Sequence, residues 1–280
     1  MDWLLDPLTY EFMQQALAAG VLMGILCPIV GTYLIVQRMA LLGDVVAHAV
    51  LPGLAIANFL NFPLLAGAFV SGMLGTFVMS WIRAQSKVKV DAAMAITFSS
   101  FFSLGITLLA GLRSRLDLEE LLFGDILSIA PADVWKIGLV TLVVLVGVKV
   151  FYKELLFFTF DQLGAEAVGL PVGAINFGLM AAITLTIVAS IKAVGVILVV
   201  ALMVNPAAAA YLLTKELHWM MMVGAGLGVL SSIVGMYISY YFNTPSGPAI
   251  ALTLFVCFLL ALLFSPSQGI LTRNRGQSKA

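Results

Sequence analysis

Long apolar runs separated by short polar breaks make up almost the whole chain. A membrane-spanning helix needs roughly 20 apolar residues, because it rises about 1.5 Å per residue across a hydrocarbon core of about 30 Å. On this criterion the sequence predicts about nine spans, or eight if one boundary is wrong. They cover approximately residues 12–36, 42–60, 64–82, 92–112, 134–150, 172–190, 194–213, 219–242 and 249–264. The least certain boundary is the interruption at Lys192, between the sixth and seventh runs.

The composition agrees with this pattern and excludes a soluble globule. The chain has 280 residues, of which 62% are hydrophobic and 10% charged, whereas soluble domains have about 45–50% apolar and about 25% charged residues. The first seven residues are acidic and lack the basic region of a signal peptide, so the first run is expected to be a permanent span. We therefore predict an all-α polytopic membrane protein, with one transmembrane domain over 1–264 and a flexible cytoplasmic tail over 265–280.

The distribution of basic residues predicts the orientation. Cytoplasmic loops usually carry the excess of lysine and arginine. With nine spans and the N-terminus outside, ten of the 14 basic residues lie on the inner side. The four on the outer side are Arg113, Arg115, Lys136 and Lys192. The expected topology is therefore N-terminus outside and C-terminus cytoplasmic.

Two segments differ from the spanning pattern. Residues 113–133 combine seven charged residues with leucine and isoleucine at helix-like intervals, which predicts an amphipathic segment at the outer surface. Residues 160–171 lie on the predicted inner side, and Leu163, Ala167 and Leu170 share one helix face there. Gly169 and Pro171 would end that helix. This pattern indicates a short surface helix.

The sequence from Gly43 to Gly53 contains the candidate site. Asp44 and His48 are four residues apart, so on a helix they share one face. An ionisable pair inside a span is costly and indicates a functional site, and carboxylate with imidazole suits a divalent transition metal. Pro52, one turn later, can bend the helix and free a carbonyl group.

A plainer interpretation of these two residues remains open. Asp44 can be a helix cap, and His48 an ordinary interfacial histidine. Asp44 follows Arg38 by only six residues, which places the pair near the inner face unless the second span begins irregularly or is tilted.

The net charge and the absence of certain motifs argue against several functions. The net charge of +0 gives no support for nucleic-acid binding. No lysine precedes serine or threonine, so the phosphate-binding loop of ATPases is absent. The chain also lacks the H-E-x-x-H motif of metalloproteases. Cys27 and Cys257 lie in apolar runs and are expected to be small hydrophobic residues.

Three motifs together resemble the permease subunit of the manganese/zinc/iron ABC importers, the ABC-3 family. They are Gly-Asp-x-x-x-His-Ala-x-Leu-Pro-Gly from Gly43, Asp-x-x-x-Ala-x-x-x-Gly-Leu at 161–170, and Ala193 to Leu198 leading to Asn205-Pro206-Ala207-Ala208. The resemblance covers nearly the whole chain and includes the segment Phe123–Leu127. Where such permeases often carry serine before the histidine, this chain has Ala47.

The resemblance implies an assembly and roles for particular residues. It implies a homodimer of permeases in the lipid membrane, two cytoplasmic ATP-binding cassette subunits and an extracytoplasmic binding protein that delivers the ion. Asp44 and His48 match the positions proposed to contact metal. The loop at 160–171 matches the coupling helix that touches the ATPase, with Asp161, Glu166, Gly169, Leu170 and Pro171. Helix bending or gating is expected at Pro52, Asn205 and Pro206.

The expected function is the membrane subunit of an ATP-driven importer of a divalent transition metal in the inner (plasma) membrane of a prokaryote. Manganese is expected first, with zinc or iron next. No cofactor is expected to be permanently bound, and the chain itself is expected not to be an enzyme, since ATP would be hydrolysed by the partner. The main alternative is a gradient-driven secondary transporter or channel; a membrane enzyme and a permease for metal chelates are further ones.

Overall fold

The computed structural model describes residues 6–112, 122, 124 and 126–265, and these are mostly helical. The elements are η1 (Asp6–Thr9), α2 (Glu11–Val36), α3 (Leu42–Phe59), α4 (Leu64–Gln85), α5 (Val90–Gly111), η2 (Ile126–Ser128), α7 (Pro131–Val150), α8 (Tyr152–Phe160), α9 (Gln162–Ala167), α10 (Val172–Leu213), α11 (Leu217–Phe242) and α12 (Ser246–Phe264). No β-strand occurs among the described residues, so the all-α prediction is confirmed.

The helices of membrane-spanning length agree with the predicted apolar runs. Seven helices, α2, α3, α4, α5, α10, α11 and α12, are long and apolar enough to span a membrane. The pair formed by α7 and α8, which meet at a bend of 72°, is an eighth candidate. This count treats residues 172–213, expected as two spans, as one 42-residue element, although it contains a kink.

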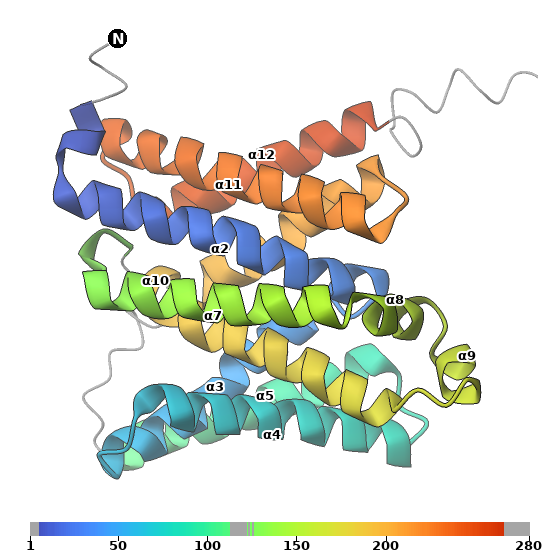
Figure 1. The fold of residues 1–280 in the computed structure, drawn as a ribbon. Coiled ribbons are helices and arrows are strands. Elements are labelled where there is room, and N and C mark those ends of the chain that lie inside the picture. Colours follow the sequence, from blue (N-terminus) through green and yellow to red (C-terminus); the bar gives the residue numbers. More distant parts are fainter. Residues whose placement is uncertain (1–5, 113–121, 123, 125, 266–280) are drawn as a thin grey trace, which may run out of the picture.

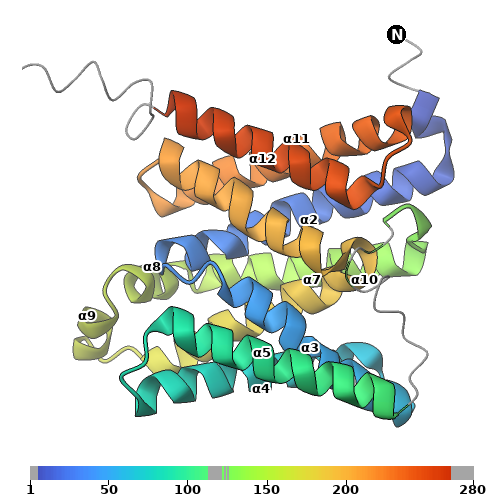
Figure 2. The same cartoon turned by 180° about the vertical axis from the view of Figure 1, so that it is seen from behind.

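This element, α10, is sharply kinked at Gly195. The backbone there has φ 73° and ψ 167°, a combination that is essentially restricted to glycine. Figures 1 and 2 show the second half of α10 running back toward the end of the bundle at which the first half begins. The loop before α7 lies against the kink, since a Cβ atom on Gly124 would overlap the backbone of Val194 and Gly195. The interruption expected at Lys192 is therefore located three residues later.

The helices pack in two groups that α10 connects. On one side α3 packs against α4 and α5, and on the other α2 packs against α11, which in turn packs against α12 (Figure 1). α10 contacts α3 and α4 in the first group and α2, α11 and α12 in the second. A change in the position of α10 would therefore affect both groups.

The helix that carries the candidate site, α3, lies between two tight turns and packs closely against α4 in its middle. Arg38 and Asn61, in the turns before and after it, adopt left-handed backbone angles with φ 59° and φ 54°. In between, α3 lies against the backbone of α4, because a Cβ atom on Gly53 would overlap the carbonyl oxygen of Gly67. Such close backbone approach is typical of helices packed within lipid.

The outer surface of the bundle is apolar, as a lipid environment requires. Large exposed hydrophobic side chains on α4, α7 and α12 include Phe77, Trp81, Leu139, Val143, Leu252 and Phe255. The start of α2 and the end of α12 lie at opposite ends of the bundle (Figure 1). This arrangement agrees with termini on opposite sides of a membrane, while the assignment of the inner side remains a prediction.

Two expected segments lie mainly outside the described residues. Of the amphipathic segment expected over 113–133, the structure describes η2, the first residues of α7 and a few isolated positions. Of the tail expected over 265–280, it describes only Ser265.

Candidate metal site

Asp44 and His48 lie in the first half of α3, one turn apart. The N-cap residue of this helix is Leu41, and no side chain caps the helix there. Asp44 is therefore in the first turn but is not the capping residue, which removes the plainer interpretation of its carboxylate. The Asp44 side chain is 42% exposed and the His48 side chain 13%. The carboxylate is thus accessible from outside the chain, while the imidazole is mostly covered.

The hydrogen bond of His48 decides which ring nitrogen is available to a metal. Its Nδ1 atom lies 2.9 Å from the backbone carbonyl oxygen of Asp44 and 3.5 Å from the carboxylate Oδ1 of the same residue. A carbonyl oxygen only accepts, so in the neutral ring Nδ1 carries the proton and donates it. The lone pair is then on Nε2, which is the atom left to coordinate a cation.

Two phenylalanines of α5 hold the His48 ring in place. The rings of Phe98 and Phe102 are nearly parallel, with centroids 5.9 Å apart and an interplanar angle of 5°. The imidazole meets both at steep angles, with centroid distances of 4.6 Å to Phe98 and 5.2 Å to Phe102. Edge-to-face contacts of this kind restrict ring rotation. These contacts therefore determine the direction in which Nε2 points.

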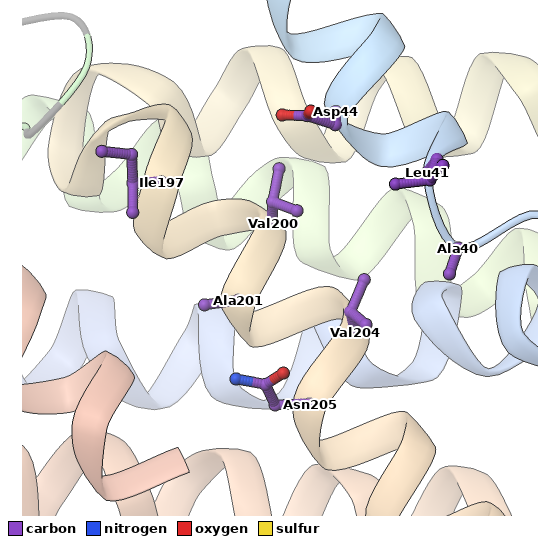
Figure 3. Close-up of a pocket in the computed structure, with 8 residues that line it drawn as sticks. All are labelled: Ala40, Leu41, Asp44, Ile197, Val200, Ala201, Val204 and Asn205. Atoms are coloured by element: carbon purple, nitrogen blue, oxygen red, sulfur yellow. The ribbon is translucent and has the colours of Figure 1, made fainter. Parts of the chain in front are cut away.

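The Asp44 carboxylate faces an open pocket of about 380 Å³ between the start of α3 and the second half of α10. The residues that line it are Ala40, Leu41, Asp44, Ile197, Val200, Ala201, Val204 and Asn205 (Figure 3). Only Asp44 and Asn205 in this set have polar side chains. His48 does not line the pocket, so the structure places the two expected ligands on one helix face but only one of them at the pocket wall.

The chain offers few further ligands. Within the described ranges, no group of three or more histidine, cysteine, aspartate or glutamate side chains is placed to hold a metal. A Mn²⁺ ion takes octahedral coordination by oxygen-rich ligands. Asp44 and His48 alone would leave most of its coordination positions to water or to another molecule.

None of the expected bending residues lies at a break in its helix. Pro52 is buried within α3, and Pro206, next to Asn205, is buried within α10. The non-helical backbone angles in α10 are at Gly195, not at Pro206. Whether Pro52 and Pro206 allow movement stays a prediction.

The expected coupling residues form a compact turn around α9, which protrudes at one end of the bundle (Figure 1). Asp161 caps α9: its Oδ1 accepts a hydrogen bond of 2.8 Å from the backbone N–H of Gly164. Gly169 ends the turn with φ 87°, and Pro171 is the N-cap of α10. Glu166 is exposed and Leu170 half-buried. The short surface helix expected from the sequence is therefore present, while its contact with an ATPase stays a prediction.

Sequence reasoning missed an ionic link near the kink of α10. The Asp133 carboxylate, at the start of α7, accepts hydrogen bonds from Lys192 (2.8 Å) and from Lys136 (2.9 Å). Lys192 lies just before Gly195 in α10. The only sequence signal for this link was that both lysines were expected on the same, outer side.

Comparison with known proteins agrees with the fold and with the motifs. The model of the ABC 3 transport family matches residues 9–265. The chain is 41% identical over 267 residues to "Manganese transport system membrane protein MntC" of Halalkalibacterium halodurans, covering 95% of this chain and 91% of the relative. It is 36% identical over 275 residues to "Probable iron transport system membrane protein" of Haemophilus influenzae, covering 98% of each.

A solved structure has the same architecture. The structure described as "PsaBC from Streptococcus pneumoniae in complex with Fab" matches with a TM-score of 0.88 and 37% identity, over 97% of this chain and 98% of that chain. The helical architecture, the family match and the helices of membrane-spanning length agree with one another. The chain is therefore a multi-pass membrane protein of the bacterial inner membrane and belongs to the ABC 3 transport family of permeases.

Proposed function

We propose that this chain is the membrane-spanning subunit of an ATP-driven importer that carries a divalent transition metal, with manganese as the first choice. The observation that carries this proposal is the exposed Asp44 carboxylate at the wall of an open pocket, with the His48 imidazole on the same face of α3. Asp44 supplies a hard oxygen ligand, and Nε2 of His48 supplies a nitrogen ligand once the ring can reach the ion.

The names of the relatives support manganese before iron. The Halalkalibacterium relative is named for manganese transport, and the Haemophilus relative for iron transport. Oxygen with nitrogen ligation accepts manganese, iron and zinc, and intrinsic affinity alone would favour zinc. Selectivity would therefore depend on ligand geometry and on the protein that delivers the ion, with zinc and iron as the next candidates.

The small number of ligands supports transit rather than storage. Two protein ligands per chain hold an ion briefly, whereas a complete set of ligands would retain it. In a homodimer of permeases, a second copy would contribute its own pair to the path. An extracytoplasmic binding protein would deliver the ion at the end where α2 begins, and α9 at the other end would contact one of two ATPase subunits. ATP would thus be hydrolysed outside this chain.

The test uses two ligand variants, each with a matched control. In cells that also produce the cognate ATPase and binding protein, Asp44→Asn and His48→Gln should each lower Mn²⁺ uptake by at least about tenfold, with unchanged amounts in the membrane. Asp91→Asn is the control for the first, because Asp91 also lies in the first turn of its helix but is not at the pocket. His218→Gln is the control for the second, because His218 is the other histidine and is half-exposed beside Glu216.

Normal uptake by both ligand variants would overturn the metal site. A separate measurement tests the energy source: uptake into membrane vesicles should stop when ATP is depleted. Uptake that continues without ATP and follows an ion gradient would instead support a secondary transporter.

A further inference from the structure

Asn205 is the second polar side chain of the pocket that contains Asp44. It comes from the second half of α10, and Figure 3 shows its amide directed toward the same space as the Asp44 carboxylate. The other lining residues carry aliphatic side chains. The pocket wall is thus a largely apolar surface with a carboxylate on one helix and an amide on the facing helix.

The amide of Asn205 makes no hydrogen bond with any residue that the structure describes. The side chain is half-buried at the pocket wall, so the amide is accessible to a group that enters the pocket. Hydroxyl side chains elsewhere in the same helix bond to the backbone one turn earlier, as Thr184 and Ser190 do. An amide retained without such a bond suggests a partner that is not part of the chain.

The helical register places Asn205 on the same face of α10 as two other residues that line the pocket. Ile197, Ala201 and Asn205 are four residues apart and therefore share one face of α10. At about 1.5 Å per residue, Asn205 is about 12 Å further along the helix than Ile197. This half of α10 runs from the kink at Gly195 toward the end of the bundle where α9 lies (Figures 1 and 2). An ion moving in that direction would meet Asn205 after the region near the kink.

We propose that Asn205 is a second contact for the transported cation, at which its amide oxygen binds the partly hydrated ion on the way from Asp44 to the inner side. This inference rests on the proposed function. A neutral amide oxygen attracts a divalent cation less strongly than a carboxylate does, so it can bind the ion and release it again. As an oxygen donor it suits Mn²⁺ better than it suits metals that prefer nitrogen or sulfur.

The test combines a variant that removes the amide with one that adds charge at the same position. Asn205→Leu keeps a side chain of similar size but offers no oxygen. Asn176→Leu is the control, because Asn176 is another asparagine of α10 and does not line the pocket. In cells with the cognate partners, Asn205→Leu should lower the maximal rate of Mn²⁺ uptake by about tenfold, and Asn176→Leu should leave it near the original value.

The second measurement tests whether a side chain at position 205 can contact the bound cation. The full-length chain, purified in detergent, is titrated with Mn²⁺ and free Mn²⁺ is followed by electron paramagnetic resonance. Asn205→Leu should leave the affinity of the Asp44-dependent site unchanged within about threefold. Asn205→Asp combined with Asp44→Asn should restore Mn²⁺ binding that Asp44→Asn alone has lost. A side chain that does not face the cation would not produce this recovery.

The outcomes separate this inference from the proposed function. If Asp44→Asn takes up Mn²⁺ normally, the proposed function itself is wrong. If Asp44→Asn stops uptake while Asn205→Leu behaves like Asn176→Leu, only the role of Asn205 is wrong. Failure of the Asn205→Asp combination to bind Mn²⁺ would likewise overturn the contact at this position.

Discussion

The imidazole of His48 stands at a steep angle to the ring of Phe98, with the two ring centroids 4.6 Å apart. Phe102 contacts the same imidazole from the next turn of α5. The position of a candidate metal ligand on α3 is therefore determined by a neighbouring helix. Movement of α5 relative to α3 would change where Nε2 of His48 points.

The first prediction concerns this aromatic support. Phe98→Leu and Phe102→Leu should each weaken Mn²⁺ binding to the purified chain by about three- to tenfold, because the ring of His48 gains freedom that binding must then restrict. The measurement is a Mn²⁺ titration of each variant. Phe77→Leu is the control, since Phe77 is 66% exposed on α4 and is not one of the two rings that contact His48. Equal affinities in all three variants would show that the phenylalanines do not position the ligand.

The second prediction concerns the kink of α10. Gly195→Ala forces a Cβ atom onto backbone angles that only glycine adopts readily, at a cost of about 1–3 kcal/mol. The unfolding temperature of the variant in detergent should fall clearly, and Mn²⁺ uptake should fall with it because the kink determines the direction of the pocket-lining half of α10.

The control for this prediction is Gly147→Ala in α7. A Cβ atom on Gly147 has no heavy atom within 4 Å, and alanine is favoured over glycine in a helix by about 1 kcal/mol. This variant should be as stable as the original protein or slightly more so. If Gly195→Ala proves as stable as Gly147→Ala, the backbone at residue 195 is not strained by a side chain.

Hydrophobicity predicted the spans well because each run must be apolar over a whole membrane thickness. It also predicted an interruption between two runs at 191–193, close to the kink at Gly195, but it could not show that the chain reverses there through a single glycine. The charge of Lys192 was the signal for this interruption. This charge is explained by the bond of Lys192 to Asp133 and not by a helix boundary.

The candidate site was predictable only where it depends on local spacing. Asp44 and His48 share a face because they are four residues apart, and the structure confirms this arrangement. The contact of His48 with Phe98 and the position of Asn205 opposite Asp44 depend on how separate helices pack. Such contacts leave no periodic pattern in a single sequence.

The last prediction concerns α9 and the proposed ATPase contact. Leu163 is 80% exposed at the protruding end of the bundle, where an apolar side chain outside the lipid is expected to be covered by a partner. Covering a leucine contributes about 1.5–3 kcal/mol, which corresponds to about a ten- to hundredfold change in affinity. Leu163→Ser should therefore reduce the amount of ATPase that co-purifies and lower uptake, while Mn²⁺ binding to the purified chain stays unchanged. Val88→Ser, an exposed aliphatic residue in the loop between α4 and α5, is the matched control and should retain the ATPase. Loss of the ATPase in both variants, or in neither, would exclude Leu163 as the specific contact.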